Sequence, residues 1–307
     1  MQESNQINIT NDLVKELLKE KRSTRRWKNF RSLLWLVLFT YIAVHIFGDL
    51  KGTSSSIGES GGKYVALIRL DGMIAPDREF SAEQVVPTLL EAFKDKNSKG
   101  VVIDINSPGG TPVQASIIHD AILEFKKKYK KKVIVVGEDM LTSGAYFISV
   151  AADQIYLNPN TITGSIGVIM KGFGFVDAMK KIGIERRVYT AGNSKDRLDP
   201  FLPQNPEDLK KIQVVMATVH QNFVQAVIEG RKGKLQGNQE ELFSGDFWSG
   251  TEAVKLGLAD HLGNLNDAMK IEFDTTEFKE FGRMPNLFRV ISSQLGSSYD
   301  RMVYTMH

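Results

Sequence analysis

Short β-branched runs alternate with helical patterns along residues 63–275, and no other feature of the sequence limits the possible folds so strongly. The runs at residues 101–105 and 133–136 are largely apolar, as in strands that are buried on both faces. Apolar residues at helical spacing follow the first of these runs, at residues 113–125. This alternation predicts an α/β domain with largely parallel strand pairing.

The individual elements follow from the same patterns. Strands are predicted at residues 64–70, 101–105, 133–136, 154–157 and 187–190. A further short strand is predicted directly after the Asp71-Gly72 turn. Helices are predicted at 82–95, 113–125, 145–152, 176–180, 206–230 and 252–257. The sequence beyond Glu277 shows no clear element, so we assign residues 276–307 to a C-terminal tail and residues 63–275 to the folded domain.

A basic leader and an apolar run precede the domain. Residues 32–48 contain no Asp, Glu, Lys or Arg, and as a helix they would span about 25 Å, the short end of a membrane crossing. We predict one transmembrane anchor there, after a basic leader at 1–31 and before a flexible Ser/Gly-rich tether at 49–62. Cations in the leader should stay cytoplasmic, which places the domain outside the cytoplasmic membrane. The alternatives, a cleaved signal peptide or a buried core helix, fit the long leader and its flanking charges less well.

Composition narrows the chemistry. The net charge of +3 comes from the leader, because residues 32–307 hold nearly equal numbers of basic and acidic residues. A basic groove for nucleic acid is therefore not expected. The absence of cysteine excludes disulfides and thiolate catalysis. Since no histidine or carboxylate pattern typical of metal ligands occurs, we expect neither a metal nor a cofactor.

Ser143 is the first candidate catalytic residue. It follows the 133–136 run and precedes Gly144 and the apolar segment 145–152, where a strand would pass into a helix. Free N–H groups at a helix start favour negative charge, which suits a serine nucleophile that creates an oxyanion. The alternative is that Ser143 only caps the helix. Gly109 and Gly110, at the end of the 101–105 run, could supply further N–H donors, or could simply form a turn after Pro108.

A serine nucleophile needs a base. A Ser-His-Asp triad remains possible on paper with one of the five histidines, at positions 45, 119, 220, 261 and 307. The other candidate is Lys195, in a loop between Gly192 and Pro200. A lysine amine can accept the serine proton once burial removes it from water, whereas a solvated loop lysine cannot do so efficiently.

Several motifs occur in an order that resembles the signal peptide peptidase A family. They are Ser107-Pro-Gly-Gly110, Thr142-Ser-Gly-Ala-Tyr146, Ala151-Ala-Asp153 with Ile155, Thr163-Gly-Ser-Ile-Gly-Val168, Lys195 and the segment 247–260. The resemblance covers about residues 63–270 and includes the preceding anchor. It implies a ClpP/crotonase-like fold of repeated β-β-α units. The single copy of the domain resembles the short form of this family.

The resemblance also implies a function. Ser143 would be the nucleophile and Lys195 the base of a Ser-Lys dyad, with the backbone N–H groups of Gly110 and Gly144 as oxyanion donors. The expected enzyme is a membrane-anchored endopeptidase that degrades cleaved signal peptides and other apolar peptides. It would work as a ring-shaped homo-oligomer whose neighbouring copies share each site. The alternatives are a protease of particular membrane proteins, such as stomatin-like ones, and an inactive peptide-binding scaffold.

Overall fold

The computed structural model describes residues 31–41 and 63–282, which belong to two separate units of the chain. Residues 31–41 form a helix whose side chains are all exposed. None of the helices in the described ranges is both long and apolar enough to cross a membrane. Most of the basic leader, residues 42–48 of the predicted anchor, the predicted tether and residues 283–307 lie outside the described part. The anchor therefore stays a prediction.

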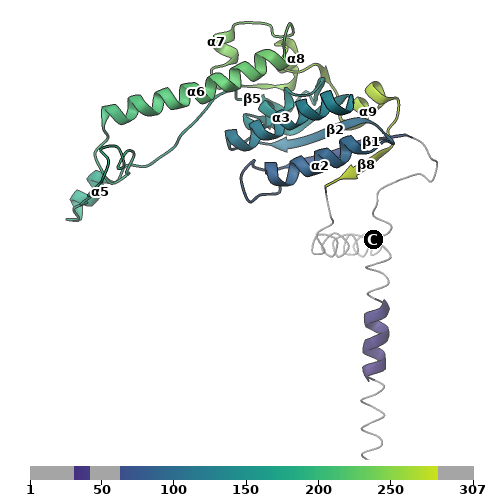
Figure 1. Cartoon of the computed structure of the whole chain (residues 1–307), viewed down its shortest axis with the longest axis horizontal. Coiled ribbons are helices and arrows are strands. Elements are labelled where there is room, and N and C mark those ends of the chain that lie inside the picture. Colours follow the sequence, from purple (N-terminus) through teal and green to yellow (C-terminus); the bar gives the residue numbers. More distant parts are fainter. Residues whose placement is uncertain (1–30, 42–62, 283–307) are drawn as a thin grey trace, which may run out of the picture. The chain divides into compact units, whose positions relative to one another are not determined.

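Residues 63–282 build one sheet with helices on both faces (Figure 1). Its strands are β1 (Tyr64–Asp71), β2 (Ser98–Ser107), β3 (Val133–Thr142), β4 (Gln154–Leu157), β5 (Ile162–Gly164), β6 (Phe247–Ser249), β7 (His261–Leu262) and β8 (Phe278–Phe281). Its helices are α2 (Ala82–Lys94), α3 (Pro112–Tyr129), α4 (Gly144–Ser149), α5 (Val176–Lys181), α6 (Pro206–Gly230), α7 (Gln239–Leu242), α8 (Gly250–Lys255) and α9 (Leu265–Phe273).

The sheet follows the order β6-β5-β3-β2-β1-β8, and its central strands are parallel. One edge of β3 pairs with β2, and the other edge is divided between β4 and then β5. The larger core lies on the face covered by α2, α3, α4 and the end of α6, while α9 closes a smaller core on the opposite face. Because parallel strands end at one edge, the loops after β2 and β3 emerge side by side.

Most predicted elements are confirmed, including α6 with the bounds that its pattern indicated. The predicted strand at 187–190 is wrong, since residues 184–190 have no regular structure. Residues 187–190 have β-branched and aromatic side chains, but none of the strands within 63–282 pairs with them. The prediction of no element after Glu277 is also wrong, because Phe278–Phe281 pairs with β1 as an edge strand.

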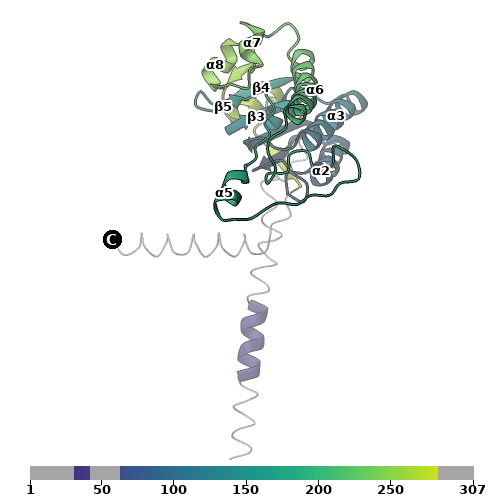
Figure 2. The same ribbon diagram turned by 90° about the vertical axis from the view of Figure 1, so that its left-hand side faces the viewer.

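An extended arm leaves the domain after β5 and returns along α6 (Figures 1 and 2). We define the arm as residues 167–222, and none of these residues is buried. Only the C-terminal part of α6 packs on the body, through Phe223, Ala226 and Val227. The arm is held internally, for example by the stacked rings of Phe175 and Phe201, whose centroids lie 5.3 Å apart. It therefore has structure of its own but no core beneath it.

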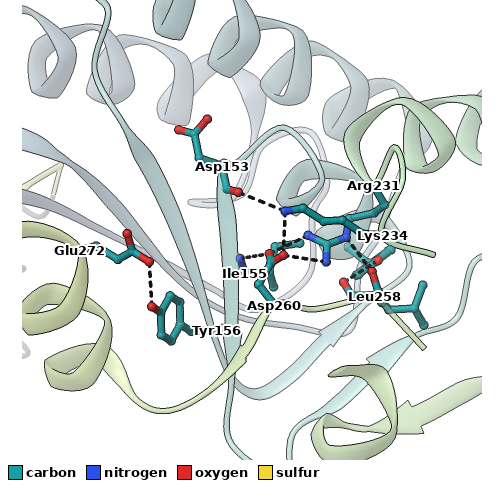
Figure 3. A network of polar contacts seen from close by, with 10 residues as sticks. Asp153, Ile155, Tyr156, Arg231, Lys234, Leu258, Asp260 and Glu272 are labelled. Carbon is teal, nitrogen blue, oxygen red and sulfur yellow. Dashed lines mark hydrogen bonds and ion pairs between the residues drawn. The ribbon is translucent and has the colours of Figure 1, made fainter. Parts of the chain in front are cut away.

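A buried ion network joins the end of α6 to the sheet (Figure 3). The guanidinium of Arg231, 2% exposed, donates to both carboxylate oxygens of Asp260 at 2.7 and 3.1 Å. Lys234 and the backbone N–H of Ile155 also donate to Asp260, at 2.7 and 2.8 Å. Burial alone would raise the pKa of Asp260, but the hydrogen bonds from Arg231 and Lys234 outweigh it and hold that pKa below its ordinary value.

We predict that Asp260→Asn lowers the free energy of unfolding by about 3 kcal/mol, because it leaves the buried Arg231 without its counter-charge. Urea unfolding followed by circular dichroism measures this. The depressed pKa of Asp260 means that its contribution is lost as the pH falls below about 4, so the difference from the wild type should shrink in acid. Glu185→Gln, in an exposed pair with Arg187, is the control and should leave the urea midpoint unchanged. Equal midpoints for Asp260→Asn and the wild type would contradict the prediction.

Candidate active site

The candidate site lies where β2 and β3 end. The two strands run in register as far as the pair Ile105 and Gly137, and pairing resumes at Ser107 and Leu141. Asn106 alone thus lies opposite residues 138–140, which form a bulge in β3. The side-chain oxygen of Asn106 accepts a hydrogen bond from the N–H of Met140 at 3.2 Å, replacing a lost ladder bond. Bulges of this kind re-aim the chain beside functional sites.

Ser143 occupies a strained turn directly after β3. Its φ of 53° and ψ of −123° are unusual for a residue with a side chain. The backbone is fixed on both sides, because the N–H of Ser143 donates to Gly164 at 2.8 Å and its carbonyl accepts from Phe147 at 2.9 Å. The side chain makes no capping hydrogen bond with α4. Ser143 therefore holds the N-cap position of α4, but its hydroxyl does not cap the helix.

The loop that carries Gly109 and Gly110 packs against this turn. A methyl group added to Gly109 would come within 2.7 Å of the Ser143 Cβ and 2.8 Å of the Gly144 nitrogen. Gly110 is equally confined, because an added methyl group would lie 1.9 Å from the carbonyl oxygen of Ile74. Ile74 makes hydrogen bonds on both sides of Gly110. Its N–H donates to the Gly109 carbonyl at 2.9 Å, and its carbonyl accepts from the Thr111 N–H at 2.9 Å. Only glycine allows this close approach of two backbones.

Two backbone N–H groups gather beside Ser143 as a result. Gly144 is the first residue of α4, so its N–H has no acceptor within the helix. The nitrogen of Gly110 would lie 3.3 Å from a methyl group built on Gly144. No acceptor for the N–H of Gly110 exists among the residues that the structure describes. Both predicted oxyanion donors are thus close to Ser143, which is the arrangement that a tetrahedral oxyanion requires.

The packing of α4 holds this arrangement in place. Tyr146 is fully buried and donates its hydroxyl to the carbonyl of Leu258 at 2.8 Å. Phe147 lies between the rings of His119 and Phe223, with centroid distances of 5.1 and 5.0 Å. These contacts tie the helix to α3, to α6 and to the loop at Leu258.

No histidine completes a triad with Ser143 in the described part of the chain. His119 pairs with its neighbour Asp120 at 2.9 Å, His220 contacts the carbonyl of Ile166, and His261 packs on Tyr156. His45 and His307 lie outside the described residues. The structure thus offers no support for the triad alternative.

Lys195 does not meet Ser143 within this chain. It lies exposed in the arm, where nearby Arg197 pairs with Asp208 in the first turn of α6 at 2.8 Å. Phe223, which contacts α4, lies 15 residues further along α6, and at 1.5 Å per residue this is about 22 Å. The structure therefore brings together Ser143, Gly110 and Gly144 but leaves Lys195 at the far end of α6.

Comparison with known proteins decides the family. A putative protease of Methanocaldococcus jannaschii is 31% identical over 249 residues, covering 78% of this chain and 79% of that protein. The model of peptidase family S49 matches residues 125–276, and a Clp protease model matches residues 68–163. The chain belongs to peptidase family S49.

Two other relatives extend this comparison. A putative signal peptide peptidase of Enterococcus faecium is 30% identical over 232 residues, or 73% of this chain and 67% of that protein. A Na(+)/H(+) antiporter NhaA of Brucella abortus is 47% identical over 182 residues, which are 59% of this chain but 25% of the antiporter. The chain thus spans only about a quarter of the length of that relative. S49 membership and the ClpP-like match agree with the fold that the sequence predicts.

We predict that Gly110→Ala lowers kcat for peptide hydrolysis by about 100-fold, with a smaller change in KM, because the added methyl group displaces an oxyanion donor. Gly233→Ala is the control, since Gly233 also has a positive φ but an added methyl group there meets nothing within 4 Å. Steady-state kinetics, with thermal unfolding to check the fold, measure both variants. Unchanged kcat in a folded Gly110→Ala protein would remove Gly110 from the site.

Proposed function

We propose that this S49 chain is a serine endopeptidase that uses Ser143 as nucleophile, Lys195 as general base, and the N–H groups of Gly110 and Gly144 as oxyanion donors. The observation that carries the proposal is the strained Ser143 turn. Its hydroxyl is free of any capping bond and lies beside two available donors. Strain of this kind persists where it presents a nucleophile.

The reaction follows from these positions. The neutral amine of Lys195 accepts the Ser143 proton as Oγ forms a bond to the carbonyl carbon of the substrate. Negative charge moves to the carbonyl oxygen, where the N–H groups of Gly110 and Gly144 stabilise it. Lys195 then protonates the leaving amine as the C–N bond breaks, and an acyl-enzyme remains. Water, activated by the same amine, releases the second product and restores Ser143.

The base comes from a neighbouring copy of the chain in this proposal. The separation of Lys195 and Ser143 along α6 argues against a dyad within one chain. The arm that carries Lys195 also exposes many large apolar side chains, among them Phe173 at 82% and Tyr189 at 91%. Exposed apolar surface of this extent is typical of an interaction site. Contact with a second copy would cover it, remove water from Lys195 and favour its neutral form.

Head-to-tail contact of this kind generates a closed ring when the rotation between copies permits it. The substrates we propose are extended apolar peptides, such as the remnants of cleaved signal peptides, which pair with strand edges beside the site. The enzyme would act at the outer face of the cytoplasmic membrane, held there by residues 32–48 with the basic leader in the cytoplasm. This location rests on the sequence pattern.

We predict that a mixture of Ser143→Ala and Lys195→Ala proteins regains peptide hydrolysis, although each variant alone is inactive. Random exchange of subunits in equal amounts would give about a quarter of the interfaces an intact serine and an intact lysine. Hydrolysis of a fluorogenic peptide should therefore recover to about a quarter of the wild-type rate. Differently tagged copies, isolated together, verify that the subunits exchange.

A mixture of the doubly substituted protein with either single variant is the control and should stay at background. Background activity in the mixture, once exchange has been verified, would place the dyad within one chain. Full activity of Lys195→Ala alone would remove the lysine from the mechanism.

A further inference from the structure

The bulge in β3 brings the carboxylate of Glu138 close to the buried carboxylate of Asp104. Asp104 of β2 lies on the face of the sheet that carries Val102 and α9, opposite the face of α4. Glu138 is the first residue of the bulge and lies within hydrogen-bonding reach of Asp104. Its backbone is fixed, because Thr161 donates its hydroxyl to the Glu138 carbonyl at 2.6 Å.

Arg69, on β1, contacts both carboxylates of this pair. Nη1 of Arg69 lies 2.6 Å from Oδ2 of Asp104 and 3.6 Å from Oε1 of Glu138. The same guanidinium also approaches Glu280 of β8, at 3.6 Å from its Nε. Asp71 adds a further negative charge from β1. On the α9 side, Glu272 is engaged by Lys132 and Tyr156. Carboxylates thus outnumber the guanidinium that faces them.

The excess of negative charge affects Asp104 most, because this carboxylate is buried. Its side chain is 2% exposed, and its second oxygen, Oδ1, has no hydrogen-bond partner among the described residues. Burial first, and the charge of Glu138 second, raise the pKa of Asp104 to about 7, although Arg69 opposes both. A protonated Oδ1 would donate to Glu138 and so gain the partner that it lacks.

We propose that Asp104 and Glu138 share one proton, and that this carboxyl pair positions the two loops of the site by holding the ends of β2 and β3 together. Asp104 lies three residues before Ser107, where the Gly109-Gly110 loop begins, and Glu138 lies five residues before Ser143. With the proton present, a hydrogen bond spans the two strands at the bulge. Without it, two adjacent anions repel each other at the base of both loops.

The first test measures stability, in the Ser143→Ala background, so it does not depend on the proposed peptidase function. Native protein should retain a proton that the unfolded chain releases between about pH 4 and pH 7, so the unfolding temperature should fall as the pH rises through this range. Asp104→Asn keeps an N–H donor for Glu138 but cannot ionise, so its unfolding temperature should fall less. At pH 8 this variant should be more stable than its parent.

The matched control is Asp139→Asn, which makes the same charge change at the exposed neighbour of Glu138 on the bulge. Its unfolding temperature should follow that of its parent at every pH. Glu138→Gln keeps a partner for Asp104 and removes the second cause of its raised pKa, while the burial of Asp104 remains, so this variant should reduce the pH dependence less than Asp104→Asn does. Parallel curves for all four proteins would overturn the shared proton.

The second test measures positioning, and it rests on the proposed function. The ratio of kcat/KM for Asp104→Asn to that of wild type should rise about tenfold between pH 6 and pH 8.5, as the wild type loses the shared proton. A constant ratio would overturn the positioning role even if the stability curves differ. If the wild type hydrolyses no peptide at any pH, the proposed function fails, and the stability curves alone decide whether the proton is shared.

Discussion

The parallel pairing of β2 with β3 decides where chemistry can occur in this chain. Because both strands end at one edge of the sheet, the Gly109-Gly110 loop and the Ser143 turn emerge together. The contact is so close that a methyl group on Gly109 would strike the Ser143 side chain. Backbone donors, a strained serine and the start of α4 thus come together through sheet topology and glycine.

The sequence predicts this region well for a local reason. Ser143 and Gly144 stand where a strand ends and a helix begins, and Gly110 lies in the short loop between β2 and α3, and such boundaries are marked by residue type. Strand and helix positions in the core follow from apolar periodicity in the same way. Asp104 can be noticed in the sequence as the one acidic residue within an apolar strand. The bulge that brings Glu138 to it depends on the register of β2 and β3, which the sequence pattern does not reveal.

The predictions from sequence are wrong for segments whose structure depends on which other segment packs against them. Residues 187–190 have strand-like composition, yet no strand of the described part of the chain pairs with them, so no ladder forms. Residues 278–281 hold two charged residues between two phenylalanines, without the alternation typical of a strand, and become a strand because they pair with β1. The sequence also does not predict that one face of α6 is exposed, because an amphipathic pattern does not indicate which surface covers the apolar face. Among residues 31–41 and 63–282 no surface covers this part of α6, which supports the assembly we propose for this S49 peptidase.

The central claim is that Ser143 is a nucleophile activated by Lys195. Labelling with a fluorophosphonate, followed by mass spectrometry of the peptides, tests it directly in the wild type, in Ser143→Ala and in Lys195→Ala. We predict a label on Ser143 in the wild type, none at this position in Ser143→Ala, and labelling at least about tenfold slower in Lys195→Ala. An unlabelled Ser143 in the wild type, or equal labelling rates with and without Lys195, would contradict the account.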